Sequence, residues 1–280
     1  IYKDVVVEPE IPLVLPEVGK AYRIKSFVSN VVAQYQNHYL VNGTTGLTFS
    51  TAAAENNTDL WVCTAAGDAG YTFASALGTA ALGWQAVAED AAVFTLSKGV
   101  KNGCFTLTSG ENNLAVTIDA AGKTTFTQST AKTQSSGWST DWYLEEVEDA
   151  TVNFATAIAK GNEWATMYLP YAVELPQGVE AYVAEEIVEK VVNLTPVMTN
   201  IPKNTAVLLR RVGEDMTAAL NLVFNLAAGD VAAVSSNLFQ GKIRTTAIPA
   251  TGGARVYLLV KYNGEEKFYW MQDEYNANCA

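Results

Sequence analysis

The sequence holds a single histidine, His38, among its 280 residues. A serine–histidine–acid triad would have to use that residue as its base, and no Gly-x-Ser-x-Gly turn supplies the nucleophile. A metal site built on histidines needs more ligands than this sequence offers. We therefore expect His38 to be a surface loop residue rather than a catalytic base, and we predict neither a metal nor a cofactor.

Cysteines and long apolar runs are also scarce. The three cysteines, Cys63, Cys104 and Cys279, cannot all pair within one chain, and their spacing fits no zinc motif. A Cys63–Cys104 bridge and two buried free thiols both remain open, and free thiols are our expectation. No apolar run reaches the roughly 18 residues that a membrane-spanning helix needs, so we predict no membrane span.

Basic residues are outnumbered, with 18 Lys and Arg against 29 Asp and Glu and a net charge of −11. Such a surface repels phosphate backbones and anionic lipids, so nucleic acid is not an expected partner. The hydrophobic content of 49% is enough for packed cores in two domains. The chain begins at Ile1 without a leader-like segment, and we expect it to be part of a longer protein.

One pattern occurs three times between residues 19 and 148: an aromatic residue, an apolar residue two positions later, a serine after two more, and then a leucine. The copies are Tyr22–Ser26 with Leu40, Tyr71–Ser75 with Leu82, and Phe105–Ser109 with Leu114. Each copy ends in a second strand, which opens at Asp59, Asp90 or Asp141. One such unit cannot bury its inner face alone, whereas three around an axis close a barrel. We predict a β-trefoil over 19–148, preceded by an extended, proline-containing lead-in over 1–18.

Residues 149–280 combine short strand candidates with frequent turn signals. The candidates are 164–169, 180–184, 187–192, 205–210, 255–262 and 267–271. Asn263-Gly264, between two aromatic-rich strands, is the strongest hairpin signal in the chain. Short strands at this spacing predict a β-sandwich, so the fold class as a whole is all-β.

At Tyr22-Arg-Ile-Lys-Ser26 and Asp141-Trp-Tyr-Leu144 the first domain resembles the ricin B-like β-trefoil lectin family, over about 19–148. In that family each unit ends in Gln-x-Trp, and the aromatic packs in the core. Here the corresponding triplets are Asp59-Leu-Trp61, Asp90-Ala-Ala92 and Asp141-Trp-Tyr143. The aromatic residue is kept twice and the glutamine never.

The resemblance implies a sugar site within a single unit, made of an acid, an aromatic platform and an amide. In the third unit these are Asp119, Phe126 and Gln134, with Trp138 beyond them. In the first unit they are Asn42, Phe49 and Asn56. The short middle unit offers only Trp84 and Gln85. Phe49 and Phe126 could instead fill the barrel core, as inward aromatic residues do in trefoils.

The second domain resembles the β-rich C-terminal modules of large secreted proteins from Bacteroidetes-type bacteria. The resembling segments are 165–171, 178–183, 201–209 and 237–241. This resemblance implies export to the cell surface, next to catalytic or adhesive domains of the full-length protein.

Carboxylates need separate consideration, because a glycosidase requires only two of them. Glu185, Glu186 and Glu189 are close in sequence, but on a strand they alternate faces and are solvated. We therefore predict a non-catalytic glycan-recognition part of a larger exported protein, with a glycan or polysaccharide as its partner. The alternatives are a scaffold without a ligand and an accessory region of a glycoside hydrolase.

Overall fold

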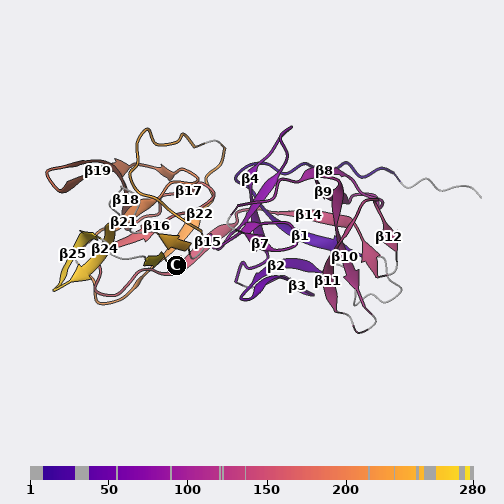
Figure 1. Ribbon diagram of the computed structural model, residues 1–280, viewed down its shortest axis with the longest axis horizontal. Coiled ribbons are helices and arrows are strands. Elements are labelled where there is room, and N and C mark those ends of the chain that lie inside the picture. Colours follow the sequence, from indigo (N-terminus) through magenta and orange to yellow (C-terminus); the bar gives the residue numbers. More distant parts are fainter. Residues whose placement is uncertain are drawn as a thin grey trace, which may run out of the picture.

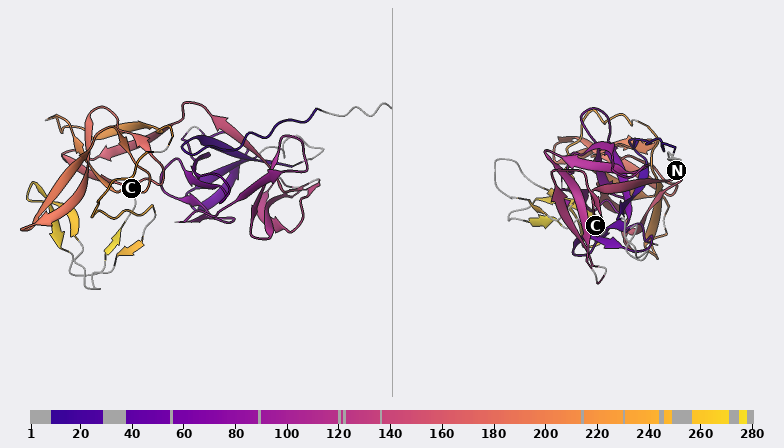
Figure 2. Two further views of the ribbon diagram at one scale, coloured as in Figure 1. Left: turned by 90° about the horizontal axis from the view of Figure 1, so that it is seen from above. Right: turned by 90° about the vertical axis from the view of Figure 1, so that its right-hand side faces the viewer.

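The computed structural model describes residues 9–28, 38–54, 56–88, 90–119, 121, 123–135, 137–213, 215–229, 231–243, 246–248, 257–270 and 275–277. All regular structure in these residues is strand. None of them forms a helix long and apolar enough to cross a membrane. Two domains lie end to end, the first coloured indigo to magenta and the second orange to yellow (Figure 1 and Figure 2, left).

Six strands of the first domain close into a ring. They are β1 (Ala21–Phe27), β4 (Leu60–Ala65), β5 (Thr72–Ser75), β8 (Thr95–Lys98), β9 (Phe105–Ser109) and β14 (Asp141–Val147). Antiparallel pairing runs from β14 through β1 and β4 to β5, and from β14 through β9 to β8. A bridge between Tyr71 and Phe94 joins β5 to β8 and completes the barrel.

Each third of the barrel carries a hairpin between its two ring strands. The hairpins are β2 (Tyr39–Gly43) with β3 (Gly46–Ser50), β6 (Ala81–Leu82) with β7 (Val87–Ala88), and β10 (Asn112–Ile118) with β11 (Thr124–Ser129). The third hairpin is widened by β12 (Gln134–Ser135) and β13 (Trp138–Ser139). The middle hairpin is much shorter than the other two.

Three equivalent aromatic pairs give the barrel its pseudo-threefold symmetry. Within each unit the two ring strands place one aromatic residue opposite another: Tyr22 and Trp61, Tyr71 and Phe94, Phe105 and Trp142. All six are buried in one core. The indole Nε1 of Trp61 donates to the carbonyl of Leu40 at 3.0 Å, and that of Trp142 donates to Leu114 at 2.9 Å. The predicted β-trefoil is confirmed by this topology.

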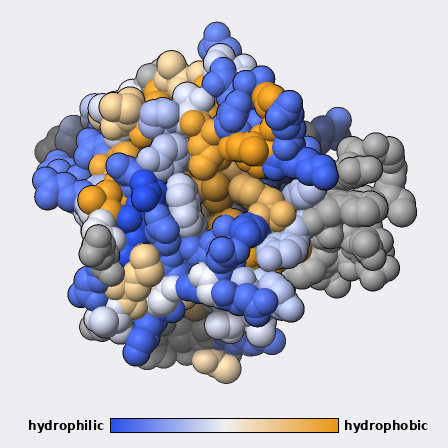
Figure 3. Space-filling view, turned by 90° about the vertical axis from the view of Figure 1, so that its left-hand side faces the viewer, coloured by the Kyte–Doolittle hydropathy of each residue, from blue (hydrophilic) through white to orange (hydrophobic). Residues whose placement is uncertain are grey.

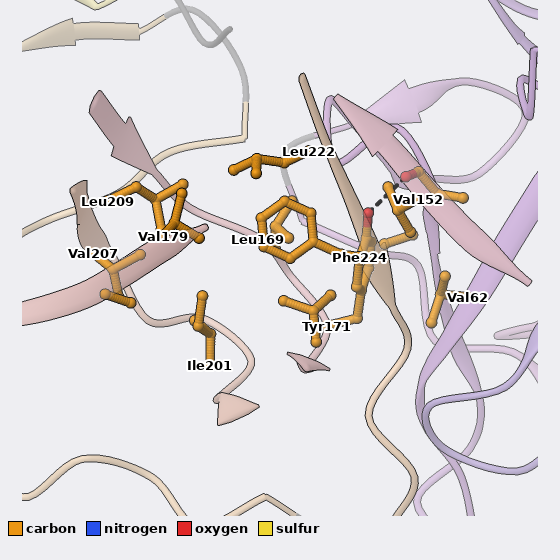
Figure 4. Packing of buried hydrophobic residues seen from close by; sticks show 14 of the residues in the cluster. Val62, Val152, Leu169, Tyr171, Val179, Ile201, Val207, Leu209, Leu222 and Phe224 are labelled. Atoms are coloured by element: carbon orange, nitrogen blue, oxygen red, sulfur yellow. Dashed lines mark hydrogen bonds between the residues drawn. The ribbon is translucent and has the colours of Figure 1, made fainter. Parts of the chain in front are cut away.

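The second domain is a β-sandwich of two layers. One layer has the order β16 (Trp164–Met167), β21 (Val207–Arg211), β18 (Val179–Val188), β19 (Val191–Val197). The other contains β15 (Thr151–Ile158), β22 (Leu220–Asn225), β17 (Val173–Glu174) and β20 (Asn200–Ile201), with a bridge from Val173 to Leu226 joining its two strand pairs. Between the layers, Val207 and Leu209 face Leu222 and Phe224 (Figure 4).

Two further ribbons lie near the C-terminal end: β23 (Thr246–Ile248) with β26 (Tyr275–Ala277), and β24 (Tyr257–Tyr262) with β25 (Glu265–Trp270). The Asn263-Gly264 hairpin is confirmed, with φ of 49° and 84° at its two turn residues. Seen from this end, most of the surface is hydrophilic and apolar side chains gather in a central hollow (Figure 3).

One predicted strand of the second domain is wrong. The segment 187–192 contains the turn at Glu189-Lys190, both with positive φ, which joins β18 to β19. Its β-branched residues favour a strand, but those residues end one strand and begin the next. The acidic side chains nearby are exposed: Glu185 accepts a hydrogen bond from Thr195, and Glu186 accepts one from Asn193.

The two domains share an apolar junction. Ala21, Leu60, Val62, Ala74 and Ala76 of the trefoil belong to the same buried cluster as the sandwich core. Tyr171 is at its centre, 2% exposed, and its hydroxyl donates to the carbonyl of Ala76 at 2.6 Å, the bond drawn in Figure 4. Lys203 also donates across the junction, to the carbonyl of Thr64 at 3.0 Å.

Residues 9–18 form no strand and lie against the trefoil. The side chain of Asn102 accepts from the backbone N–H of Ile11 and donates to the carbonyl of Pro9, both at 2.8 Å. Leu13 packs on the barrel core. The lead-in segment therefore runs along the trefoil, and its first described residues lie at the end of the barrel away from the second domain (Figure 2, left).

Candidate functional site

The third unit does not bring its four predicted residues onto one surface. Facing residues on neighbouring antiparallel strands project to the same side of a sheet. Phe126, Val116, Ser139 and Gln134 form one such row, and Val116 is fully buried, so this row faces the core. Trp138, 38% exposed, belongs to the opposite row with Thr117 and Thr125. Phe126 and Gln134 are thus separated from Trp138 by the sheet.

Asp119, the predicted acid of that unit, holds a turn. Its Oδ1 accepts the backbone N–H groups of Ala121 and Lys123, each at 2.9 Å. This local pattern is typical of aspartate in tight turns. The carboxylate is exposed at the end of the third hairpin.

The two proposed platform aromatics pack against each other instead of facing outward. The ring centroids of Phe49 and Phe126 are 4.6 Å apart, and Phe49 also stacks on Trp142 at 6.3 Å. Both rings are partly buried and pack on the barrel core. Of the two interpretations open at the sequence level, the structure favours core packing.

A groove lies where the hairpin of the first unit meets the short hairpin of the second. Its volume is about 900 Å³, and it contains two of the predicted first-unit residues, Asn42 and Asn56. The remaining lining residues come from both units: Val41, Gly43, Thr44, Thr45, Gly46, Leu47, Thr58, Leu77, Thr79, Ala80, Gln85, Ala86 and Val87. Figure 1 shows the elements involved, β2, β3 and β7, near the junction with the second domain.

Asn42 forms the polar centre of this groove. It is 9% exposed, and its Nδ2 donates to Ser75 Oγ and Thr79 Oγ1, both at 3.1 Å. Its backbone N–H donates to the carbonyl of Thr58 at 2.8 Å, which brings Thr58 to the groove. Because these bonds use both side-chain N–H groups, Asn42 can offer a ligand its carbonyl oxygen, an acceptor.

The second unit contributes Gln85, which has a φ of 59°. A left-handed backbone is uncommon for a residue other than Gly, Asn or Asp, and such conformations concentrate at functional sites. The adjacent Trp84 is partly buried and packs against the barrel core, with its ring 6.3 Å from that of Phe94 between centroids.

The groove is neutral. All its lining residues are Asn, Gln, Thr, Gly, Ala, Val or Leu, so none has an ionisable side chain. Amides and hydroxyls both donate and accept hydrogen bonds, and the exposed Thr44, Thr45 and Asn56 leave such groups open to solvent. The arrangement suits a ligand that is itself uncharged and rich in hydroxyl groups.

The prediction that His38 lies in a surface loop is wrong. The residue is 3% exposed, and its Nδ1 lies 2.8 Å from Thr124 Oγ1, so it connects the first unit to the third. Its carbonyl accepts from the backbone N–H of Ser26 at 2.9 Å. Burial lowers the pKa of the imidazole. The residue is part of the barrel rather than of a surface loop.

The aspartates that seemed to recur by symmetry are not equivalent. Asp59 precedes its core tryptophan by two positions, whereas Asp141 directly precedes Trp142. Asp59 is fully buried and accepts from Arg23 Nε at 2.9 Å. Asp141 accepts the backbone N–H groups of Val100 and Lys101, each at 2.8 Å, and burial raises its pKa. Asp59 also accepts the backbone N–H of Ala54 at 3.1 Å, so it holds the nearby chain, whereas Asp141 holds a turn that is distant in sequence.

Cys63 and Cys104 are free and buried, as expected. Burial raises the pKa of each thiol to about 11, so both are neutral at physiological pH. Cys279 lies outside the described residues. Within the described part of the chain, no three His, Cys, Asp or Glu residues gather closely enough to hold a metal ion.

The sequence analysis did not predict how the groove is assembled. It assumed that one unit supplies a complete site, and so it grouped Asn42 and Asn56 with Phe49, which faces inward. The true neighbours, Thr79 and Gln85, belong to the next unit. The available signal was the run of small and hydroxyl residues at 43–46 beside a short second hairpin.

No protein-family model and no curated protein matches this sequence. Among solved structures, the chain is similar to a lectin of Polyporus squamosus, crystallised with a human-type influenza-binding epitope. The TM-score is 0.34 and the sequence identity is 16%. The similarity covers 50% of this chain and 52% of the lectin, so about half the length of each protein is matched.

Proposed function

We propose that the first domain recognises carbohydrate without catalysis, and that the neutral groove between its first and second units binds an uncharged saccharide. The observation that carries this proposal is the lining of the groove. Amides, hydroxyls, backbone groups and small apolar side chains line about 900 Å³ of space, with no charged side chain among them. This volume is near the upper end of the roughly 300–1,000 Å³ usual for small-molecule sites, which leaves room for more than one sugar ring.

Hydrogen bonding is the principal source of affinity in this proposal. The lining includes no aromatic side chain, so the stacking that often holds a pyranose is replaced by amide and hydroxyl contacts. Each such bond contributes about 0.5–1.5 kcal/mol net. A shallow site of this kind gives affinities on the order of millimolar to micromolar.

The chemistry of the groove argues against turnover. Glycoside hydrolysis needs two carboxyl groups flanking the bond to be cleaved. The lining contains none. Binding would also be insensitive to chelators, because neutral amide and hydroxyl groups alone are weak ligands for divalent cations.

The test is a glycan array probed with wild type and Ala86→Trp. Ala86 is exposed on the groove wall, and a tryptophan there fills the groove without removing any side-chain hydrogen bond. We expect wild type to bind neutral glycans and Ala86→Trp to lose that signal. The matched control is Ala131→Trp, at an exposed position of the third unit outside the groove. Retained binding in Ala86→Trp would contradict the proposal.

The third unit offers a second surface that the same array can assess. Trp138 is exposed beside Thr117 and Thr125, whose hydroxyls are 2.8 Å apart. An aromatic side chain next to hydroxyls is a combination suited to sugar stacking. If Trp138→Ala loses the signal and Ala86→Trp retains it, this face is the binding site. No signal from wild type on any glycan supports the scaffold alternative.

Export to the cell surface, as a non-catalytic accessory part of a larger secreted protein, belongs to the same proposal. Its support is the sequence resemblance of the second domain to Bacteroidetes modules. Fractionation of cells expressing the natural full-length protein tests it. Recovery from the cytosol alone would contradict this part.

A further inference from the structure

We propose that the second domain holds one wall of the groove in place, and that Tyr171 is a positioning residue for saccharide binding. The wall is the β5–β6 turn, residues 75–80. This inference rests on the proposed function, because it concerns the affinity of the same groove.

The β5–β6 turn has two sides with different neighbours. Leu77, Thr79 and Ala80 line the groove. Ala76 and Gly78, which alternate with them, are buried against the second domain. Residues 76–80 of this turn therefore belong to the binding site and to the domain junction at once.

The turn is too tightly bonded for its two sides to move independently. Backbone bonds run from Ser75 N to the carbonyl of Ala80 at 2.8 Å and from Gly78 N to the carbonyl of Ser75 at 2.9 Å. The hydroxyl of Ser75 also accepts from Leu77 N at 3.3 Å. A displacement of Ala76 or Gly78 must therefore displace Thr79 and Ser75.

Movement of Ser75 and Thr79 changes the position of Asn42, the polar centre of the groove, directly. Ser75 Oγ and Thr79 Oγ1 are the two acceptors that orient the amide of Asn42. On the other side, the Tyr171 hydroxyl donates to the carbonyl of Ala76 at 2.6 Å. One short path of hydrogen bonds thus connects Tyr171, through the turn, to Asn42.

The second domain gives this wall a rigid support. A Cβ at Gly78 would lie 2.5 Å from Leu169 Cδ2, so the turn is packed directly on the sandwich. Leu169 and Tyr171 are each 2% exposed and belong to its core. Close-packed side chains of this kind transmit displacement instead of absorbing it.

The experiment compares Tyr171→Phe with Lys203→Met. Each change removes one hydrogen bond from the second domain to a trefoil carbonyl, but only that of Tyr171 reaches the β5–β6 turn. Two quantities are measured on the full chain: affinity for a neutral glycan that binds wild type, and amide hydrogen exchange of residues 76–80 without ligand. Exchange reports the state of the wall even where no glycan is bound.

We expect Tyr171→Phe to weaken binding by roughly two- to tenfold, the limit set by one hydrogen bond, and to speed exchange over 76–80. Lys203→Met should change neither. Gly78→Ala pushes the same turn away from Leu169 and should also weaken binding, which gives a second test if Tyr171→Phe is unstable.

The outcomes separate this inference from the proposed function. If Ala86→Trp retains binding, the groove is not the site and both proposals fail. If Ala86→Trp abolishes binding while Tyr171→Phe leaves affinity unchanged, the groove proposal stands and the positioning role of Tyr171 is overturned. The same holds if Lys203→Met weakens binding as much as Tyr171→Phe.

Discussion

The cores of the two domains differ in how they are completed. The trefoil core closes on itself, because the aromatic pairs of its three units fill one barrel. The sandwich core is continuous with five trefoil residues at the junction. A repeated motif buries its inner face with its own copies, whereas the second domain relies on a neighbour. We therefore expect the trefoil to fold alone and the sandwich to depend on it.

We expect the largest loss of stability from a substitution in the trefoil core, which closes on itself. Trp142→Ala removes a fully buried side chain that donates to Leu114, and we expect a loss of about 3–5 kcal/mol in the free energy of unfolding. Chemical denaturation followed by tryptophan fluorescence measures it. The exposed Trp138 is the control, and Trp138→Ala should cost less than about 1 kcal/mol. Similar losses at both positions would contradict the barrel assignment.

The junction should be the next most sensitive region. Gly78→Ala combines a left-handed backbone, φ 67°, with a Cβ forced against Leu169, and should destabilise by about 1–3 kcal/mol. Gly161→Ala is the matched control, because its φ is 79° but nothing lies within 4 Å of the added Cβ. The difference between the two unfolding free energies isolates the junction. Equal losses would mean that the domains do not press on each other there.

We expect a smaller change in stability with pH, because His38 lies at the contact between the first and third units. Burial lowers the pKa of His38 below its ordinary 6.5 in the folded chain. The unfolded chain therefore binds the proton first, so this contribution to stability is full above pH 6.5 and declines as the pH falls below it. Urea midpoints from about pH 8 to about pH 5 measure this slope. His38→Gln should flatten it, and an unchanged slope would show that other groups cause it.

The smallest expected effect is on thiol reactivity. With pKa values of about 11 and no exposure, Cys63 and Cys104 should react with a thiol reagent only when the barrel opens. Mass spectrometry of a Cys279→Ser variant counts the labelled thiols. Prompt labelling of either one under native conditions would contradict its burial.

More of the fold than of the candidate site could be predicted from the sequence. The triple pattern led to the barrel because Tyr22, Tyr71 and Phe105 recur with their serines in an order that only a shared core explains. The offset between Asp59 and Asp141 was visible in the sequence, two positions before Trp61 against one before Trp142, but the repeated strand pattern led us to treat the two aspartates as equivalent. The β18–β19 turn was missed because Glu189 and Lys190 do not resemble turn residues.

The groove was harder to predict because it belongs to no single unit. Asn42 and Asn56 were found as polar residues of the first unit, yet their partners Thr79 and Gln85 follow in the second. Sequence patterns within a repeat report how that repeat is built. They contain little information about which side chains of the next repeat lie beside it.

Because β6 and β7 are short, the number of saccharides that one chain can bind differs from what a threefold barrel suggests. Three long hairpins would surround the barrel evenly and produce three related surfaces. With strands of only two residues each, the middle hairpin leaves a gap beside the first, and the groove occupies it. If this groove is the saccharide site, as we propose, each chain takes up one ligand there, and firm attachment would require dense presentation of many chains.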